Sequence, residues 1–181
     1  MRCAAPGRIR NFPDVADAVD IIAALRKRAM TVAVAESLTG GLLLAELIRP
    51  AGASEVVLGG VVAYNTELKA TLLGVDPSLL AEHGPVHPDV ATAMARAVRQ
   101  RLAVGGRAAD LGIATTGVAG PDSLHGEPPG VVYLGLSLGD ESHVRRLALS
   151  GSRDDIRASS VEAALDWIAE TLERGLARAR E

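Results

Sequence analysis

Ser37 occupies a position where a hydroxyl could act as a nucleophile. The segment 31–35 before it is β-branched or small and predicts a buried strand, and Gly40 and Gly41 after it open an apolar segment that predicts a helix. The serine is therefore expected at the carboxyl edge of a sheet, beside backbone N–H groups that can face an anion. The residue types alone leave a second interpretation open, in which Ser37 or Thr39 only caps the helix.

Lys69 is the residue that could activate such a serine. Thr66 is expected to cap a short helix that runs to Leu73, which places Lys69 in its first turn. The positive end of the helix dipole disfavours a cation there, so the neutral amine, which can accept a proton from a serine, is favoured. A lone lysine can equally be a solvated surface residue.

Tyr64 invites comparison with the Tyr-x-x-x-Lys pair of short-chain dehydrogenases. The interval between Tyr64 and Lys69 is one residue too long for that pair, and no Gly-x-Gly-x-x-Gly follows the first predicted strand. A dehydrogenase is therefore not supported.

A loop of small residues follows the strand predicted over 111–115. Its first residues are Thr116, Gly117, Val118, Ala119, Gly120 and Pro121. Small residues leave backbone N–H groups free to meet a ligand. The loop lacks the lysine of a P-loop, so hydrolysis of a nucleoside triphosphate is not supported. By itself, the segment is explained equally well as a plain connection.

Arg153 and Arg157 lie one helical turn apart at the start of a helix predicted over 153–177. Ser152 and Asp155 fit a capping box at this start. Cations are disfavoured at a helix N-terminus, so a bound phosphate would explain the two guanidinium groups. Neutralisation by the neighbouring acidic residues explains them equally well.

Composition and charge exclude several classes of function. The chain has 181 residues, a net charge of −3 with scattered basic residues, and 2% aromatic residues. It therefore has neither a basic stripe nor a stacking platform for nucleic acid. Its apolar stretches are shorter than the ~18 residues of a membrane span, and its His, Asp and Glu residues lack metal-ligand spacing. We expect no nucleic-acid partner, no membrane association, no metal and no cofactor.

The cellular compartment follows from two further observations. Cys3 is the single cysteine, so no internal disulfide is expected, and the first ten residues lack the apolar run of a signal peptide. We therefore expect a cytoplasmic protein.

The order of elements predicts an α/β fold, a three-layer α/β/α sandwich with a mixed sheet. Residues 1–12 are expected to form a flexible tail and residues 13–181 a single domain. Gly59-Gly60 predicts a bulge or close backbone approach, and Gly139-Asp140 predicts a hairpin. The expected helices span 13–28, 40–48, 66–73, 77–82, 88–104 and 153–177, and the expected strands span 31–35, 56–63, 111–115, 131–138 and 142–149.

Taken together, these segments resemble the CinA C-terminal domain family, the nicotinamide-nucleotide amidohydrolases. The resemblance runs from Asp14 to Leu172. Its most specific blocks are Ala35-Glu36-Ser37-x-Thr39-Gly40-Gly41, Gly59-Gly60-Val61-Val62-x-Tyr64 with Lys69, Leu72-Leu73-Gly74-Val75, His83-Gly84-x-Val86 and Thr116-Gly117-x-Ala119-Gly120-Pro121-Asp122. The chain departs from the usual family pattern at Leu38, Asn65-Thr66, Ser123-Leu124 and Ser152, and no departure removes a proposed catalytic group.

The resemblance implies a metal-free domain that converts nicotinamide mononucleotide to nicotinate mononucleotide and ammonia. By position, Ser37 matches the family's nucleophile, and Tyr64 and Lys69 match its activating partners. The implied substrate-binding residues are Thr39, Gly40, Gly41, Thr116, Gly117, Ala119, Gly120, Pro121 and Arg153, the last as a phosphate ligand. A homo-oligomer is expected as well, with the apolar region 59–63 as a candidate surface.

Two other functions stay open. A non-catalytic nucleotide-binding or regulatory module, related to competence or damage-inducible proteins, would keep the glycine loops and Arg153 without needing Ser37, Tyr64 and Lys69 together. An amidase for another small amide would use the same catalytic groups on a different substrate. Many relatives also carry an N-terminal domain similar to molybdopterin-binding proteins, for which we expect no room in this chain.

Overall fold

A five-stranded mixed sheet forms the centre of the molecule. The structure, a computed structural model, describes the backbone of residues 16–178 and the side chains through residue 173. The strands are β1 (Val32–Glu36), β2 (Val57–Val62), β3 (Leu111–Gly117), β4 (Val131–Leu138) and β5 (Glu141–Ala148). Their order in the sheet is β2-β1-β3-β4-β5, in which β1 pairs with β2 and β3 in parallel and β4 pairs antiparallel with β3 and β5.

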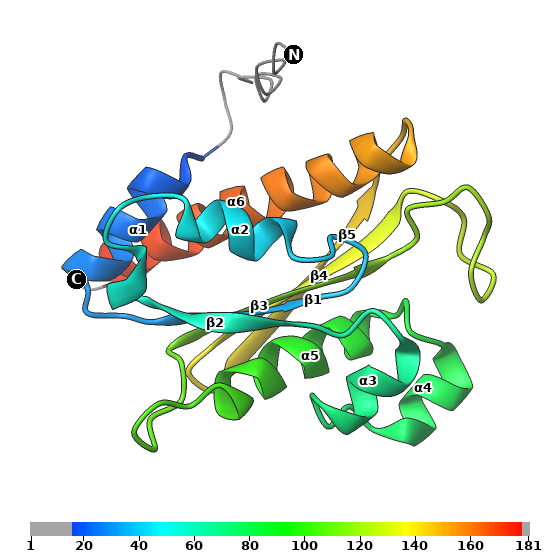
Figure 1. Cartoon of the computed structure of the whole chain (residues 1–181), viewed down its shortest axis with the longest axis horizontal. Helices are drawn as coiled ribbons and strands as arrows, with labels where there is room; N and C mark the ends of the chain where they lie inside the picture. Colours follow the sequence, from blue (N-terminus) through cyan, green and yellow to red (C-terminus); the bar gives the residue numbers. More distant parts are fainter. Residues whose placement is uncertain (1–15, 179–181) are drawn as a thin grey trace, which may run out of the picture.

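Helices cover both faces of this sheet (Figure 1). On one face lie α1 (Ala18–Lys27), α2 (Leu42–Ile48) and α6 (Arg153–Arg178). On the other lie α3 (Thr66–Thr71), α4 (Pro77–His83) and α5 (Pro88–Arg101), while a short 3-10 helix, η1 (Ala53–Glu55), leads into β2. The predicted α/β fold with a mixed sheet between helical layers is confirmed.

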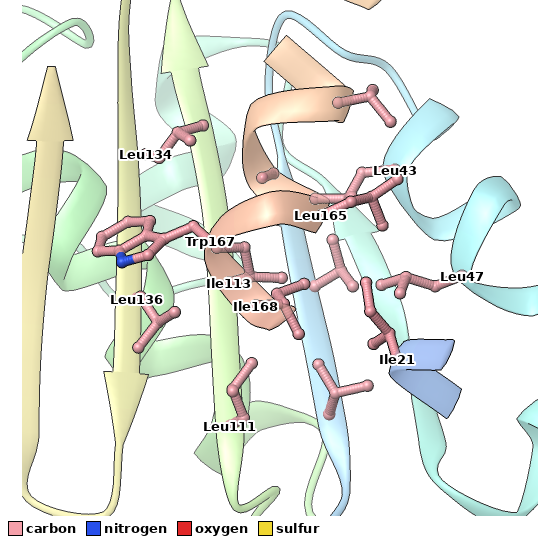
Figure 2. Close-up of a cluster of buried hydrophobic side chains, with 14 of the residues drawn as sticks. Ile21, Leu43, Leu47, Leu111, Ile113, Leu134, Leu136, Leu165, Trp167 and Ile168 are labelled. Atoms are coloured by element: carbon pink, nitrogen blue, oxygen red, sulfur yellow. The ribbon is translucent and has the colours of Figure 1, made fainter. Parts of the chain in front are cut away.

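Apolar side chains fill the space between the layers. On the α6 face, Ile113, Leu134 and Trp167 belong to a cluster shared by the sheet, α1, α2 and α6 (Figure 2). On the α5 face, Met94 packs with small sheet residues such as Ala114. Burial of each large aliphatic side chain contributes about 1.5–3 kcal/mol, so these clusters hold the sheet edges in fixed positions.

The sheet places three chain segments at one edge. β1 and β3 run in parallel, with Glu36 opposite Thr115 and, on the other side, opposite Val62 of β2. The turn after β1, the segment after β2 and the loop after β3 therefore leave the sheet side by side. This is the edge at which parallel α/β sheets bind their ligands.

Several predicted features of the sheet are confirmed. The pairing of β1 with β2 shifts by one residue, because Val32 lies opposite Val57 while Ala33 lies opposite Gly59. This irregularity falls at Leu58, directly before the glycine pair for which a bulge or close backbone approach was predicted. The predicted hairpin joins β4 and β5.

The structure differs from the prediction at some helix ends. Asn65, not Thr66, caps α3, because its side chain accepts the N–H of Glu67 at 2.9 Å. α5 ends at Arg101 rather than residue 104, because Val104 pairs with Arg107 around two glycines. The tail predicted over 1–12 and the helix start predicted at residue 13 lie outside the described residues.

Gly112 and Gly135 allow α5 to lie against the sheet backbone. A Cβ at position 112 would overlap the carbonyl oxygen of Ala95, and a Cβ at position 135 would overlap that of Ala91. Both acceptors belong to the helix backbone, which cannot move without displacing the helix. The distance between α5 and the sheet therefore depends on these two glycines.

We predict that Gly112→Ala lowers the free energy of unfolding by about 3 kcal/mol, the upper end for overpacking a core. Gly105→Ala is the matched control, because its φ of +60° imposes backbone strain while no atom lies near the added Cβ. That strain costs about 1–2 kcal/mol. Urea denaturation of both variants measures the difference, and equal losses would contradict the close-packing account.

Candidate active site

Glu36, the last residue of β1, fixes the turn that carries Ser37. Its carboxylate is 1% exposed and accepts the N–H groups of Gly41 at 3.0 Å, Leu43 at 3.1 Å and Leu44 at 2.9 Å. Glu36 therefore caps α2, and the hydroxyl groups of the turn do not. The first N–H groups of α2 are bound by this carboxylate instead of facing a substrate anion.

Thr115 of β3 holds the same turn from its other side. Its carbonyl oxygen accepts the N–H of Ser37 at 3.0 Å. Its hydroxyl lies 2.7 Å from the hydroxyl of Thr39, which is fully buried. Thr39 is therefore bonded within the protein, behind the serine.

Ser37 and Lys69 are in direct contact. The Nζ of Lys69 lies 2.9 Å from the Oγ of Ser37 and donates a second hydrogen bond to the carbonyl oxygen of Ala63 at 2.8 Å. Lys69 is 1% exposed and Ser37 is 8% exposed. The amine therefore sits beneath the hydroxyl, within proton-transfer distance of it.

Burial makes the amine of Lys69 a usable base. Removal from water disfavours the ammonium form and lowers the pKa of Lys69 from its ordinary value of 10.5 to about 8. The sequence also predicted that the neutral amine of Lys69 is favoured, but for a different reason: the lysine was expected at the start of a helix. That reason is wrong, because Lys69 lies in the last turn of α3.

A pocket of about 310 Å³ opens above Ser37. Its lining comes from the turn after β1, the segment after β2, the loop after β3 and the start of α6. The lining residues are Ser37, Leu38, Tyr64, Gly117, Val118, Ala119, Gly120, Pro121, Asp122, Ser123, Leu124 and Arg153. The serine hydroxyl is thus the nucleophile-capable group at the base of a cavity open to small molecules.

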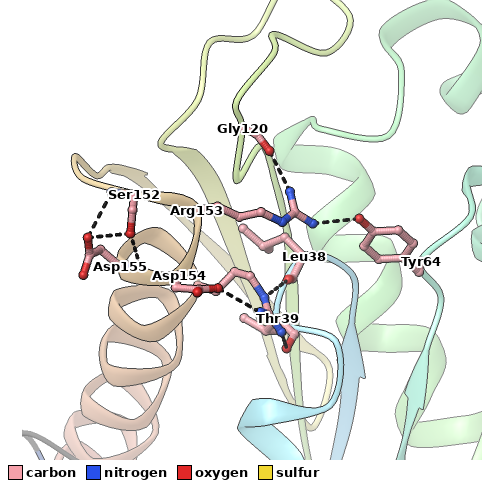
Figure 3. Close-up of polar contacts among 9 residues, drawn as sticks. Leu38, Thr39, Tyr64, Gly120, Ser152, Arg153, Asp154 and Asp155 are labelled. Atoms are coloured by element: carbon pink, nitrogen blue, oxygen red, sulfur yellow. Dashed lines mark hydrogen bonds and ion pairs between the residues drawn. The ribbon is translucent and has the colours of Figure 1, made fainter.

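Arg153 joins two walls of this pocket (Figure 3). Its guanidinium donates to the carbonyl oxygen of Gly120 at 2.7 Å and to the hydroxyl of Tyr64 at 2.9 Å. Tyr64 is 60% exposed, and its hydroxyl meets Arg153 rather than Lys69. A guanidinium has five N–H donors, so groups remain that could bind an anion in the pocket.

Arg157 contacts the nucleophile turn instead of the pocket. Its guanidinium donates to the carbonyl oxygen of Leu38 at 3.0 Å and to that of Thr39 at 3.3 Å, and it pairs with Asp154 at 3.4 Å. The predicted capping box is present one turn earlier, where Asp155 accepts the N–H of Ser152 at 3.0 Å.

The predicted site residues fall into two groups. Ser37, Tyr64, Gly117, Ala119, Gly120, Pro121 and Arg153 line the pocket. Lys69, Thr39, Gly40, Gly41 and Thr116 are not among the lining residues. Lys69, Thr39 and Thr116 are buried, whereas Gly40 is exposed and Gly41 half-buried. Thr116, for example, donates its hydroxyl to the carbonyl oxygen of Pro85 at 2.6 Å.

Glu36, Thr115 and Arg157 shape the site in ways that the sequence did not reveal. A carboxylate at the end of an apolar strand is a usable signal, because a buried charge requires hydrogen-bond partners. The contacts of Thr115 and Arg157 join residues far apart in the sequence, and no spacing rule indicates them.

Within the residues whose side chains are described, no group of three or more His, Cys, Asp or Glu residues is placed to hold a metal ion. His83, the last residue of α4, and His87, which precedes α5, do come together, with ring centroids 4.3 Å apart. In the described part of the chain, no helix combines the length and apolarity that crossing a membrane requires.

The fold and the site define a mixed α/β domain with a Ser–Lys pair at the base of an edge pocket. Residues 16–172 match the family described as the CinA C-terminal domain. The chain therefore belongs to the CinA C-terminal domain family.

Relatives of known sequence agree with this assignment. The chain is 47% identical over 144 residues to a putative competence-damage inducible protein of Moorella thermoacetica, and 45% identical over 148 residues to a CinA-like protein of Frankia casuarinae. These alignments cover 79% and 82% of this chain but 34% and 33% of the two relatives. The chain thus spans about a third of the length of the curated relatives it matches.

Solved structures show the same fold along nearly their whole length. A CinA superfamily protein from Klebsiella pneumoniae is similar with a TM-score of 0.80 at 29% identity, covering 87% of this chain and 96% of that one. A competence/damage inducible protein from Agrobacterium tumefaciens has a TM-score of 0.79 at 29% identity, covering 91% and 99%.

We predict that Lys69 makes the stability of the protein depend on alkaline pH. The folded state releases the Lys69 proton near pH 8 and the unfolded state near 10.5, so the unfolded state binds more protons between these values. The free energy of unfolding should therefore rise between pH 8 and 10.5, by about 3 kcal/mol. Urea denaturation of wild type and Lys69→Met across this range measures the effect, and parallel curves would contradict it.

Proposed function

We propose that the protein hydrolyses the carboxamide of nicotinamide mononucleotide to a carboxylate and ammonia, with Ser37 as nucleophile and neutral Lys69 as base. The observation that carries this proposal is the 2.9 Å contact between the buried amine and the hydroxyl at the base of the pocket. Ser–Lys pairs are a variant of the nucleophile–base arrangement that needs no histidine. The family resemblance supplies the substrate.

The chemistry proceeds in two stages. Lys69 accepts the proton of Ser37 as the Oγ bonds to the carboxamide carbon, and the tetrahedral intermediate then expels ammonia, which takes the proton from Lys69. Water next attacks the acyl-enzyme, with Lys69 accepting its proton. The ester bond to Ser37 breaks, the serine oxygen regains the proton, and the carboxylate product leaves.

Backbone N–H groups are needed to stabilise the oxyanion of this intermediate. The N–H of Gly40 donates to the carbonyl oxygen of Ser37 at 3.2 Å, so it is not available. The N–H of Val118 donates to the carbonyl oxygen of Val131 in β4. Because successive residues of a strand point their N–H groups to opposite sides, the N–H of Gly117 points away from β4, toward β1 and the Ser37 that follows it. We therefore assign the backbone N–H of Gly117 as a donor to the oxyanion.

Arg153 is the pocket residue best suited to the substrate's phosphate. It lines the pocket with donors beyond the two that hold Tyr64 and Gly120. The cavity volume of about 310 Å³ is at the lower end of the range for small-molecule sites. We assign Tyr64 the role of orienting Arg153, and Lys69 the role of transferring the proton.

A non-catalytic nucleotide-binding module is the alternative, and the names of the relatives, which refer to competence and damage, agree with a regulatory role. Such a module would use the pocket and Arg153. It would gain nothing from burying an amine against a serine, which costs desolvation free energy. The enzyme is therefore the better-supported function.

We predict that Ser37→Ala releases no ammonia from nicotinamide mononucleotide, because it removes the group that bonds to the carboxamide carbon. Binding should persist, which a substrate-induced thermal shift checks. For the wild type, kcat/KM should rise with pH and level off above an apparent pKa of about 8, as Lys69 becomes neutral. Full activity in Ser37→Ala would end this mechanism, and binding without turnover in the wild type would favour the regulatory module.

We predict that Arg153→Gln lowers kcat/KM for nicotinamide mononucleotide about 10–100-fold, the value of a charge-assisted hydrogen bond. Nicotinamide riboside lacks the phosphate, so its kcat/KM should change much less. The ratio between the two substrates is the measurement. A ratio that is the same in wild type and variant would remove Arg153 from phosphate recognition.

A further inference from the structure

We propose that Arg157 is a positioning residue that aims the backbone N–H of Leu38 at the oxyanion, so that Leu38 and Gly117 stabilise it together. This inference rests on the proposed serine chemistry but does not depend on which amide is the substrate. It gives Arg157 a role separate from phosphate binding.

The carbonyl groups of the nucleophile turn all point away from the pocket toward protein donors. Arg157 holds the carbonyl oxygens of Leu38 and Thr39 at 3.0 Å and 3.3 Å, and the N–H of Gly40 holds the carbonyl oxygen of Ser37 at 3.2 Å. A peptide group is planar, so its N–H points opposite to its carbonyl oxygen. The carbonyl of one residue lies in the same peptide plane as the N–H of the next. By holding the carbonyl of Thr39, Arg157 directs the N–H of Gly40, and that N–H holds the carbonyl of Ser37, whose peptide contains the N–H of Leu38. Arg157 therefore acts on the N–H of Leu38 through Gly40.

The N–H of Leu38 has the position and the freedom that an oxyanion donor needs. It belongs to the residue directly after the nucleophile, and Leu38 lines the pocket while being only 4% exposed. Within the described residues this N–H forms no hydrogen bond, whereas the neighbouring N–H groups of Ser37 and Gly40 are bonded. A buried donor without a partner is unfavourable in the free protein and is satisfied when an oxyanion is present.

Arg157 is suited to hold this turn because both its backbone and its guanidinium are held in place. It lies in the first turns of α6, a helix packed on the sheet through buried residues such as Ile156 and Ser160. Asp154 pairs with the guanidinium, and a Cβ at Gly40 would come within 3.5 Å of it, so the guanidinium fits closely against the turn. A single ammonium can replace only part of a planar fork that binds two adjacent carbonyl groups.

The test uses a fluorophosphonate probe on the full chain. The serine oxygen bonds to phosphorus, fluoride leaves, and Lys69 accepts the serine proton, so the adduct places a phosphoryl oxygen where the oxyanion would lie. In Arg157→Ala we expect the labelling rate and kcat for nicotinamide mononucleotide to fall by up to about 100-fold, because the oxyanion donor is misplaced but not removed. KM should change far less, and the pKa of the pH profile should stay where it is in wild type.

Two further variants separate positioning from general loss of structure. Arg49→Ala is the matched control, because Arg49 forms ion pairs with Asp17 and Glu46 at the far end of α2 and should label as wild type does. Arg157→Lys keeps the charge and most of the stem and should label at an intermediate rate. Methylguanidinium should restore part of the labelling rate of Arg157→Ala.

The outcomes distinguish this inference from the proposed function. The wild type could be labelled at a rate that depends on Arg157 and yet fail to hydrolyse nicotinamide mononucleotide. That result would support the positioning role of Arg157 and contradict the proposed substrate. Arg157→Ala labelling as fast as Arg49→Ala would overturn the inference. Failure of the wild type to label at Ser37 would overturn both the activated serine and the role of Arg157.

Discussion

The hydrogen bond between the buried amine of Lys69 and the hydroxyl of Ser37 is the interaction on which the rest of the site depends. The two atoms are 2.9 Å apart, and the amine has its other hydrogen bond to a backbone carbonyl rather than to a carboxylate. Without an acidic partner, burial is free to lower the pKa of Lys69 to about 8. An arrangement of this kind is costly for stability and useful for proton transfer, which is typical of active sites.

Three polar contacts hold the serine in register with that amine. Glu36 binds the start of α2, Thr115 binds the N–H of Ser37, and Arg157 binds the carbonyl groups that follow. They come from β1, β3 and α6, so the turn is fixed only when the sheet and its helical layer are assembled. The same assembly brings Arg153 across the pocket to Gly120 and Tyr64. The catalytic geometry is thus a property of the fold and not of the local sequence around Ser37.

Local patterns predicted the fold, but the pairing of Ser37 with Lys69 was predicted only through the family resemblance, because the residue types alone also allowed a helix cap and a solvated surface lysine. Apolar periodicity and the glycine pairs gave the elements, and short motifs placed Ser37 and Lys69 at strand and helix ends. The reason offered for the neutral amine was wrong, because burial of Lys69 depends on how α3 packs, which no local pattern contains. The pairing of Tyr64 with Arg153 joins residues 89 positions apart. Such contacts are fixed by strand order, and strand order could not be read from residue spacing.

The pKa of Lys69 is the most direct test of this account. The sequence contains two lysines, Lys27 and Lys69, so lysine labelled with ¹³C at Cε gives two signals, which Lys27→Arg assigns. An NMR titration should show Lys69 losing its proton near pH 8, well below the ordinary lysine value of 10.5. A Lys69 signal that titrates near 10.5 would show that almost none of the amine is neutral around pH 8, and would contradict its role as the base.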